Sequence, residues 1–436
     1  MHYDDLYQSK KLSSQEAVTP IRDGSKLLVA MAAGAPPALM AAIAQRVASD
    51  DLKELVLYYK LAPPRLTDTL LADDVLPKLK ANTFFVTGKE HVIIKKQQKT
   101  GKKLLSFVPV NFSQIPRLVA QMKPDTFIVQ VSPMDGGGYF SLGTNNDYAS
   151  TAARACGRLI VEVNQSMPRV FGRSQIHVSE VDVLVENTSD LEETPIVEPG
   201  PDDIQIGSLI SPLVPDGATI QLGIGKVPSG VARSLMDHRD LGIHTELLSD
   251  AMIDMIEKGV VTGEHKQLHP GKHVFTVALG SRRLYDFMDD NSSMDSYPSS
   301  YVNGISTIAQ LDNFISINTA IEVDLYGQVN AEFIGDHEYS GSGGQFDFVK
   351  GASLSRGGKS IIALHSTALK GTRSTIVPKV PMVTDDRMDV EHIVTENGVV
   401  NLRGLSTAER AHALISIAHP KFREELTVAA RKVVLI

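Results

Sequence analysis

Two segments far apart in the chain follow one pattern, and this repeat constrains the fold more than any other feature. Residues 21–46 read IRDGSKLLVAMAAGAPPALMAAIAQR, and residues 214–237 read VPDGATIQLGIGKVPSGVARSLMD. Each contains an Asp-Gly turn, an apolar run, a loop of small residues, a proline and an amphipathic helix pattern. A second apolar segment follows each, LKELVLYYK at 52–60 and IHTELLS at 243–249. This order predicts an α/β protein of two related open halves with mostly parallel sheets.

A polar stretch separates the two halves. Residues 189–203 read SDLEETPIVEPGPDD, with three prolines, one glycine and six acidic residues. Such a composition is typical of an exposed connection. We therefore expect an N-terminal α/β domain over residues 1–190, a linker over 191–203 and a C-terminal α/β domain over 204–436.

The composition excludes several classes of partner and location. The net charge of −8 argues against binding the phosphate backbone of a nucleic acid. The uncharged run at residues 27–44 contains Gly34, Pro36 and Pro37, so a strand, a loop and a helix describe it better than a membrane span. The polar N-terminus shows no signal peptide. We expect a soluble, cytoplasmic protein with no membrane partner.

The single cysteine, Cys156, allows no disulfide within the chain, which fits a reducing compartment. Its apolar neighbours in TAARACGRLIVEV favour a small packed hydrophobe over a nucleophile.

Two glycine-rich loops are candidate ligand sites. Residues 223–230, GIGKVPSG, follow an apolar run and precede a helix pattern, an arrangement that suits an anion at a helix N-terminus. The third glycine and Lys226 are misplaced for a dinucleotide or triphosphate motif, and a plain strand–helix turn is the alternative. Residues 339–348, YSGSGGQFDF, suit backbone N–H groups that approach a ligand closely, as in an oxyanion hole. A flexible surface turn is the alternative there.

Other groups of polar residues are weaker candidates. His265, His269 and His273 are spaced by four, but Pro270 and Gly271 interrupt the helix that metal binding would need, so a solvated loop is favoured and no metal site is expected. The lysine-rich run at 95–103 predicts a solvated turn, with a phosphate contact left open. No GxSxG motif is present.

Glu246 is the remaining candidate. It stands near the end of the apolar segment that follows the GIGKVPSG unit, where parallel α/β sheets form ligand sites. A salt-bridged or edge glutamate is the alternative.

Several stretches resemble one family. They are GIGKVPSGVA, LGIHTELLSDAMIDMIEKGVVTG, IEVDLYGQVNAEFIG, YSGSGGQFDFVKGASLSRGGKSIIAL, EVNQSMPRVFG and IHVSEVDVLVE. Together they are similar to the acetyl-CoA hydrolase/transferase family, and most of all to its 4-hydroxybutyrate and butyryl-CoA:acetate CoA-transferases. The resemblance spans essentially the whole chain and implies a CoA-transferase-like fold.

The resemblance also implies a mechanism. Glu246 would attack an acyl-CoA thioester to form an acyl-glutamyl anhydride, and the released thiolate would convert this to a glutamyl-CoA thioester that a second carboxylate resolves. The implied oxyanion loop contains Gly341, Gly343 and Gly344. The implied CoA-binding residues are Gly223, Ile224, Gly225, Lys226, Val227, Asn318, Gly341 and Lys370.

The resemblance implies acyl-CoA and small carboxylates as substrates, no permanently bound cofactor and a homodimer. Three positions depart from the family pattern: His365 replaces a proline, INTA replaces INSA, and SGSGGQ replaces SGFGGQ. The sequence leaves two other functions open. One is an acyl-CoA hydrolase that uses the same Glu246, and the other is a nucleotide-binding regulatory protein.

Overall fold

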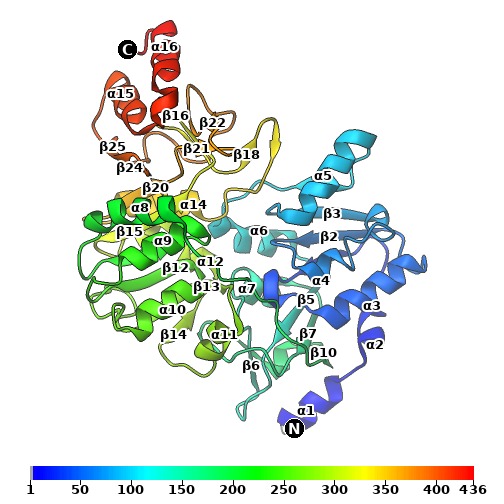
Figure 1. The fold of residues 1–436 in the computed structure, drawn as a ribbon. Helices are drawn as coiled ribbons and strands as arrows, with labels where there is room; N and C mark the ends of the chain where they lie inside the picture. The colour runs from blue at the N-terminus through cyan, green and yellow to red at the C-terminus, as the bar shows by residue number, and fades with distance from the viewer. Residues whose placement is uncertain (1–2) are drawn as a thin grey trace. The chain divides into compact units, whose positions relative to one another are not determined.

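The computed structural model describes residues 3–436, which form two compact units. Unit 1 comprises Met1–Pro195 and Phe275–Tyr301, and unit 2 comprises Ile196–Val274 and Val302–Ile436. In the colours of Figure 1, unit 1 is mainly blue to cyan and unit 2 mainly green to red.

The segment Phe275–Tyr301 groups with unit 1, although the sequence-based boundaries assign it to the C-terminal domain. Backbone hydrogen bonds explain the grouping. The N–H groups of Asn146 and Asp147 both donate to the carbonyl of Thr276, and the N–H of Ala278 donates to the carbonyl of Thr144. The chain therefore leaves unit 1 and later returns to it. No local sequence pattern predicts this return.

The main sheet of unit 1 has seven strands in the order β10-β7-β5-β1-β2-β3-β4. Every neighbouring pair in it is parallel. The strands are β1 (Lys26–Val29), β2 (Leu55–Tyr59), β3 (Leu79–Thr83), β4 (Leu105–Phe107), β5 (Thr126–Val131), β7 (Leu159–Val163) and β10 (Val183–Glu186).

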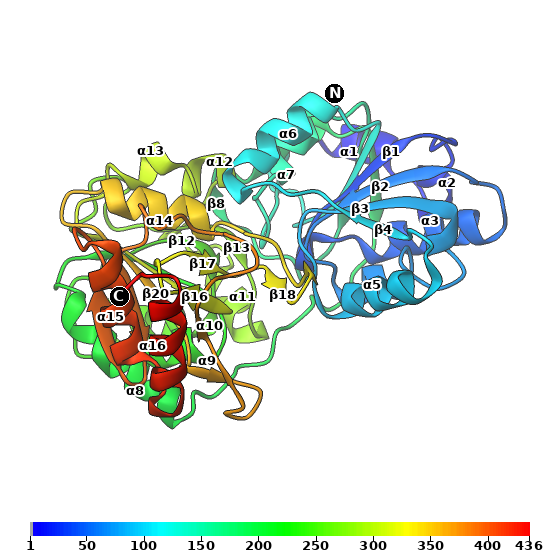
Figure 2. The ribbon, with the colours of Figure 1, turned by 90° about the horizontal axis from the view of Figure 1, so that it is seen from above.

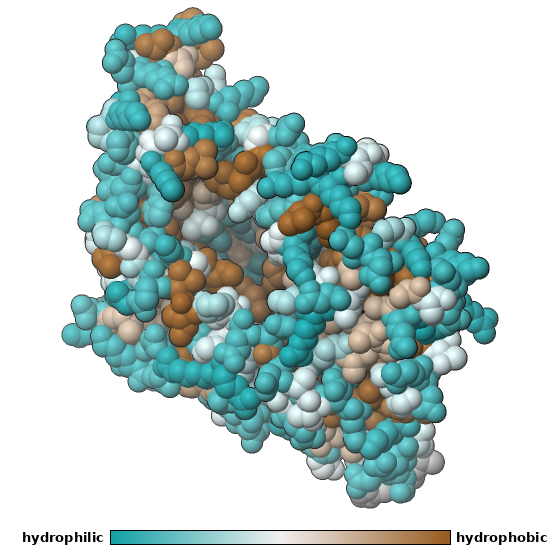
Figure 3. All heavy atoms as spheres, turned by 45° about the vertical axis from the view of Figure 1, so that its right-hand side comes forward, coloured by the Kyte–Doolittle hydropathy of each residue, from teal (hydrophilic) through white to brown (hydrophobic). Residues whose placement is uncertain are grey.

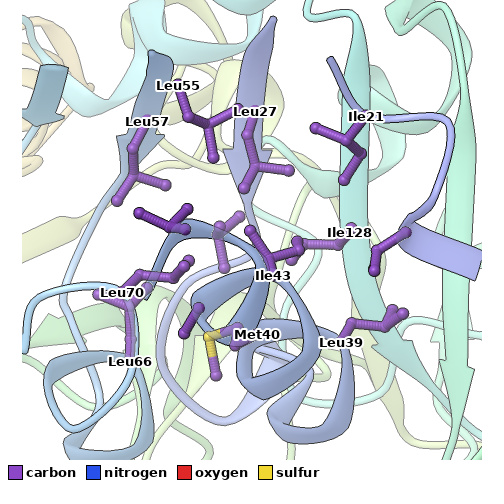
Figure 4. Close-up of a cluster of buried hydrophobic side chains, with 14 of the residues drawn as sticks. Ile21, Leu27, Leu39, Met40, Ile43, Leu55, Leu57, Leu66, Leu70 and Ile128 are labelled. Atoms are coloured by element: carbon purple, nitrogen blue, oxygen red, sulfur yellow. The ribbon is translucent and has the colours of Figure 1, made fainter. Parts of the chain in front are cut away.

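Helices cover both faces of this sheet because side chains alternate along each strand. Leu27 packs with α3 (Pro37–Ala48) on one face (Figure 4), in a cluster that also includes Val29. Leu28 packs in a second cluster with α6 (Ile115–Met122) and α7 (Ala149–Ala155). The helices of unit 1 are α1 (Tyr3–Lys10), α2 (Ser14–Val18), α3, α4 (Pro64–Thr67), α5 (Gly88–Thr100), α6 (Ile115–Met122), α7 (Ala149–Ala155) and α11 (Arg282–Met288). Its short strands are β6 (Tyr139–Ser141), β8 (Phe171–Gly172), β9 (Gln175–His177) and β14 (Met294–Ser296).

In unit 2, sheet strands lie in the order β25-β24-β20-β15-β11-β12. All neighbours in this series are parallel except β24 and β25. The strands are β11 (Thr219–Leu222), β12 (Gly242–Leu248), β15 (Phe314–Thr319), β20 (Lys359–Ala363), β24 (His392–Thr395) and β25 (Gly398–Asn401). Strand β13 (His273–Ala278) spans the boundary of the two units.

The helices of unit 2 complete its layers. They are α8 (Pro201–Ile210), α9 (Lys226–Ser234), α10 (Asp250–Glu257), α13 (Ile305–Ile308), α14 (Gln345–Leu354), α15 (Thr407–Ile417) and α16 (Arg423–Lys432), while α12 (Ser299–Val302) crosses the boundary. The last two helices lie side by side in Figures 1 and 2 and contribute to one apolar cluster with Val323, Ile362 and Ile393. Short strands form three small separate sheets. They are β16 (Glu322–Asp324), β17 (Val329–Asn330), β18 (Phe333–Ile334), β19 (His337–Glu338), β21 (Thr367–Ala368), β22 (Arg373–Ser374) and β23 (Ile376–Val377).

The predicted α/β class with mostly parallel sheets is confirmed, and so is the repeat. In unit 1, β1, α3 and β2 follow one another, and β1 pairs parallel with β2. In unit 2, β11, α9 and β12 do the same. The uncharged run at 27–44 is strand, 3₁₀ turn and helix, as expected.

Two local expectations need correction. The lysine-rich run at 95–103 is not a turn, because α5 continues to Thr100 and ends only at Gly101, whose φ of 66° lies in the left-handed region. Its lysines are solvated on a helix surface, where the run of charges hides the helical period. The predicted linker ends before Asp203, because α8 begins at Pro201 and Asp203 is buried.

Among residues 3–436, no helix combines the length and the apolar character needed to cross a membrane. The face drawn in Figure 3 is mainly hydrophilic, with apolar atoms in separate groups.

Glycines set the packing of α8 against α9 in unit 2. A Cβ on Gly207 would lie 2.5 Å from the carbonyl oxygen of Gly230. A Cβ on Gly230 would overlap the carbonyl of Asp203. Gly230, the last glycine of GIGKVPSG, is therefore needed for close helix packing, which fits the interpretation of this loop as a plain strand–helix turn.

We expect Gly230→Ala to destabilise unit 2 by about 1–3 kcal/mol, because backbone atoms must move to admit the methyl group. Thermal unfolding followed by circular dichroism measures the loss. Gly88→Ala is the matched control, since a Cβ at Gly88 meets nothing within 4 Å. Equal melting temperatures for the two variants would contradict this account of the helix contact.

Candidate active site

Glu246 lies near the carboxyl end of β12, half-buried, on the strand next to β11. Because side chains alternate along a strand, His244 and Glu246 share one face and Thr245 takes the other. The three residues of the HTE segment therefore make different contacts.

His244 fixes the chain beside the carboxylate. It is fully buried, and its Nε2 lies 2.8 Å from the carbonyl oxygen of Val302. Burial first, and then the charge of Lys266, lower the pKa of His244 to about 3. The ring is therefore neutral at physiological pH, and Nε2 carries the proton that the carbonyl accepts. This bond holds the backbone immediately before Asn303.

Asn303 contacts the candidate nucleophile directly. Its Nδ2 donates to Glu246 Oε2 at 2.6 Å, across 57 positions of sequence. Asn303 is buried, so the donor is held in place. Sequence reasoning did not find this residue, because a single asparagine in the segment SSYVNG carries no motif.

The glycine-rich segment reaches the same carboxylate through Gly344. A Cβ at this position would overlap both Glu246 Oε2 and Asn303 Nδ2, so glycine is required here for space. Gly341 and Gly343 have φ values of 155° and 54°, which favour glycine for conformation. The segment then enters α14 at Gln345. Of the three predicted loop glycines, Gly344 is the one that a contact places at Glu246.

The predicted CoA loop follows β11, the neighbour of the strand that carries Glu246. Thr245 Oγ1 lies 3.3 Å from the carbonyl oxygen of Leu222 and 3.1 Å from that of Leu247, so it ties β12 to the last residue before the loop. Gly225, at φ 110°, caps α9. Ile224, Gly225 and Lys226 are exposed, Gly223 is half-buried and Val227 is buried. The loop and Glu246 thus share one edge of the sheet, where parallel strands end.

The two further CoA-contact candidates are placed differently. Asn318 lies on β15, and its amide is engaged with Gln221 at 3.1 Å and Ser316 at 2.9 Å. Lys370 lies in the exposed turn between β21 and β22, a two-stranded sheet separate from the one that carries Glu246. His365 follows β20, and its Nε2 lies 2.8 Å from Asp203 Oδ1.

The weaker candidates do not form a second site. The expectation that His273 lies in a solvated loop is wrong. His273 is the first residue of β13, where burial lowers its pKa to about 4. The described part of the chain holds no cluster of three or more His, Cys, Asp or Glu residues that suits a metal ion. Burial raises the pKa of the Cys156 thiol to about 11, which keeps it protonated and unreactive.

Comparisons with known proteins identify the family of the chain. Residues 1–198 match the acetyl-CoA hydrolase/transferase N-terminal domain, and residues 280–430 match the C-terminal domain of the same family. Succinyl-CoA:cyclohexane-1-carboxylate CoA transferase of Geobacter metallireducens is 41% identical, with 99% of this chain and 97% of that protein covered. The 4-hydroxybutyrate coenzyme A transferase of Clostridium kluyveri is 38% identical, with 98% of each covered.

A solved structure extends the comparison to the fold. The crystal structure of RipA from Yersinia pestis covers 100% of both chains at 46% identity, with a TM-score of 0.97. Sequence and fold therefore agree over the whole length, and the chain belongs to the acetyl-CoA hydrolase/transferase family.

Proposed function

We propose that this protein is a CoA-transferase that moves CoA between a short-chain acyl-CoA and a carboxylate acceptor through Glu246. One observation carries the proposal. The Glu246 carboxylate is held by the Asn303 amide against a glycine at which no side chain fits. A carboxylate in such contact with backbone is arranged to react rather than to stabilise the fold. Relatives that align over nearly the whole chain are CoA-transferases by name, whereas two relatives that align over about half of it are named acetyl-CoA hydrolases.

The chemistry needs a nucleophile that is also a good leaving group. A Glu246 oxygen attacks the thioester carbonyl, the C–S bond breaks, and CoA departs as a thiolate. The thiolate then attacks the glutamyl carbonyl of the anhydride, the C–O bond breaks, and the first acid departs as its carboxylate. The product is a glutamyl-CoA thioester. The acceptor carboxylate reverses both steps and leaves as the new acyl-CoA.

Each step develops negative charge on a carbonyl oxygen, which fixed N–H donors stabilise. We assign this role to the segment of Gly341, Gly343 and Gly344, because it brings backbone rather than side chains to Glu246. The Asn303 amide orients the attacking carboxylate. We assign CoA contacts to the loop at residues 223–227, which is exposed at residues 224–226 and lies on the same sheet edge.

The first test is a trapped intermediate. Incubation with butyryl-CoA in the absence of acceptor should leave CoA attached to Glu246, because the second half-reaction cannot proceed. Peptide mass spectrometry measures the adduct and its position. Glu246→Gln should form no adduct and should lose transfer by about 10³-fold or more, because the amide is a poor nucleophile.

Glu424→Gln, an exposed change at the start of α16, is the control and should behave as the parent protein. Steady release of free CoA without any adduct would instead identify an acyl-CoA hydrolase. Adduct at another residue, or transfer retained in Glu246→Gln, would remove Glu246 from the nucleophile role.

The steric requirement at Gly344 gives a second prediction. Gly344→Ala should lower the maximal rate of transfer by about 10²-fold, because its methyl group displaces the carboxylate and the amide that holds it. Steady-state kinetics measure the effect. Gly136→Ala is the control, since its Cβ enters open space. A Gly344→Ala enzyme of parental rate would show that the close contact has no part in the reaction.

A further inference from the structure

The glycine-rich segment, residues 339–345, is hydrogen-bonded at both ends to residues of unit 2 that lie beside or pair with β17. At its start, the N–H groups of Tyr339 and Ser340 donate to the carbonyl of Glu332 at 2.7 and 3.2 Å. At its end, Gln345 Nε2 donates to Asp385 Oδ2 at 2.6 Å. Gln345 directly follows Gly344 and is the first residue of α14. The bond to Asp385 therefore acts one residue away from the contact with Glu246.

Asp385 is itself firmly placed. Its backbone pairs with Val329 of β17, with N–H to carbonyl distances of 3.2 Å in both directions. Its side chain is fully buried. In the described chain, Oδ1 is a buried oxygen without a hydrogen-bond partner, while Oδ2 accepts from Gln345. A carboxyl group with one satisfied and one unsatisfied buried oxygen is unusual enough to need an explanation.

We infer that Asp385 is a positioning residue for the candidate active site, which holds Gly344 against Glu246 through the side chain of Gln345. The inference rests on the proposed function for its role in the reaction. Asp385 does not touch Glu246 in this arrangement and acts only through Gln345.

The environment of Asp385 keeps it protonated up to neutral pH. Burial raises its pKa most, the hydrogen bond from Gln345 lowers it, and the charges of Glu332 and Asp389 raise it further, to about 7. Glu332 accepts from Thr384 Oγ1 at 3.1 Å and is itself faced by Glu338, and its own pKa is raised, chiefly by burial. Asp389 is paired with Lys350 of α14 at 2.7 Å. Two neighbouring carboxylates, Glu332 and Asp389, thus disfavour the charged form of Asp385.

Ionisation of Asp385 should destabilise the anchored arrangement through the cost of a buried charge, although the Gln345 hydrogen bond itself favours the charged form. As the neutral acid, Asp385 accepts the Gln345 hydrogen bond at Oδ2 and buries no charge. Above about pH 7 the proton leaves and a buried charge without a second donor remains, which costs free energy unless the segment moves to admit water. The rate of transfer should therefore fall as pH rises through this range.

Two substitutions at Asp385 separate positioning from simple support of the fold. Asp385→Ala leaves the Gln345 amide without its acceptor and should lower kcat by about tenfold, with little change in the KM for acyl-CoA. Asp385→Asn offers a neutral amide oxygen to the same donor. It should keep kcat within about threefold of the parent at pH 6 and should lack the fall above pH 7. Full steady-state kinetics from about pH 5.5 to about pH 8.5 measure both effects.

Hydrogen exchange gives a readout that does not need activity. Backbone amides of residues 341–348 should exchange faster in Asp385→Ala than in the parent, and at the parental rate in Asp385→Asn at pH 6. Glu424→Gln is the control, because it changes an exposed carboxylate at the start of α16. It should leave both the pH profile and the exchange of this segment unchanged.

The outcomes distinguish this inference from the proposed function. Unchanged exchange and unchanged kcat in Asp385→Ala would overturn the inference, as would an Asp385→Asn enzyme that keeps the parental fall above pH 7. Faster exchange in Asp385→Ala, in a protein whose parent shows no transfer, would support the positioning role and overturn the proposed function. If Asp385→Ala does not fold, Gln345→Ala removes the same bond and must give the same loss of kcat and the same exchange.

Discussion

The contact between one carboxylate and one stretch of backbone is the constraint on which the candidate site depends. Glu246 cannot lie where it does unless position 344 carries no side chain, and the Asn303 amide cannot reach it unless the chain at 302–303 is fixed. His244 supplies that fixation with a hydrogen bond to Val302. The carboxylate of the candidate nucleophile is thus held by an amide and lies against a glycine.

Buried polar groups support this arrangement. Burial keeps His244 uncharged, so it donates a hydrogen bond without placing a positive charge beside Glu246. Asp385 is likewise buried, with a pKa raised to about 7, and accepts from Gln345 behind the glycine-rich segment. Both groups would disturb the electrostatics of the site if they were charged. Burial therefore keeps His244 neutral at physiological pH and moves the ionisation of Asp385 to about pH 7.

Much of the fold could be predicted because the relevant forces are local. The repeated strand–loop–helix–strand pattern, the position of Glu246 near the end of β12 and the glycine loops all follow from short-range periodicity and turn chemistry. The predictions that failed involve residues whose surroundings come from elsewhere. The lysine-rich run at 95–103 was predicted to be a turn because its charges conceal the helical period. His273 was predicted to be solvated because no local pattern indicates that it is buried.

The sequence by itself determined the α/β class, the parallel halves and the identity of Glu246 as the candidate nucleophile. It also identified the two glycine-rich segments as candidate ligand loops, because a strand end, a turn and the absence of a side chain are properties of a few adjacent residues. Only the tertiary structure decided that Asn303 holds the carboxylate, that Gly344 is needed for space and that Asp385 anchors Gln345. These are contacts between residues 40 or more positions apart, such as the 57 that separate Glu246 from Asn303. Such contacts depend on how strands and helices pack, and no local pattern of the chain encodes them.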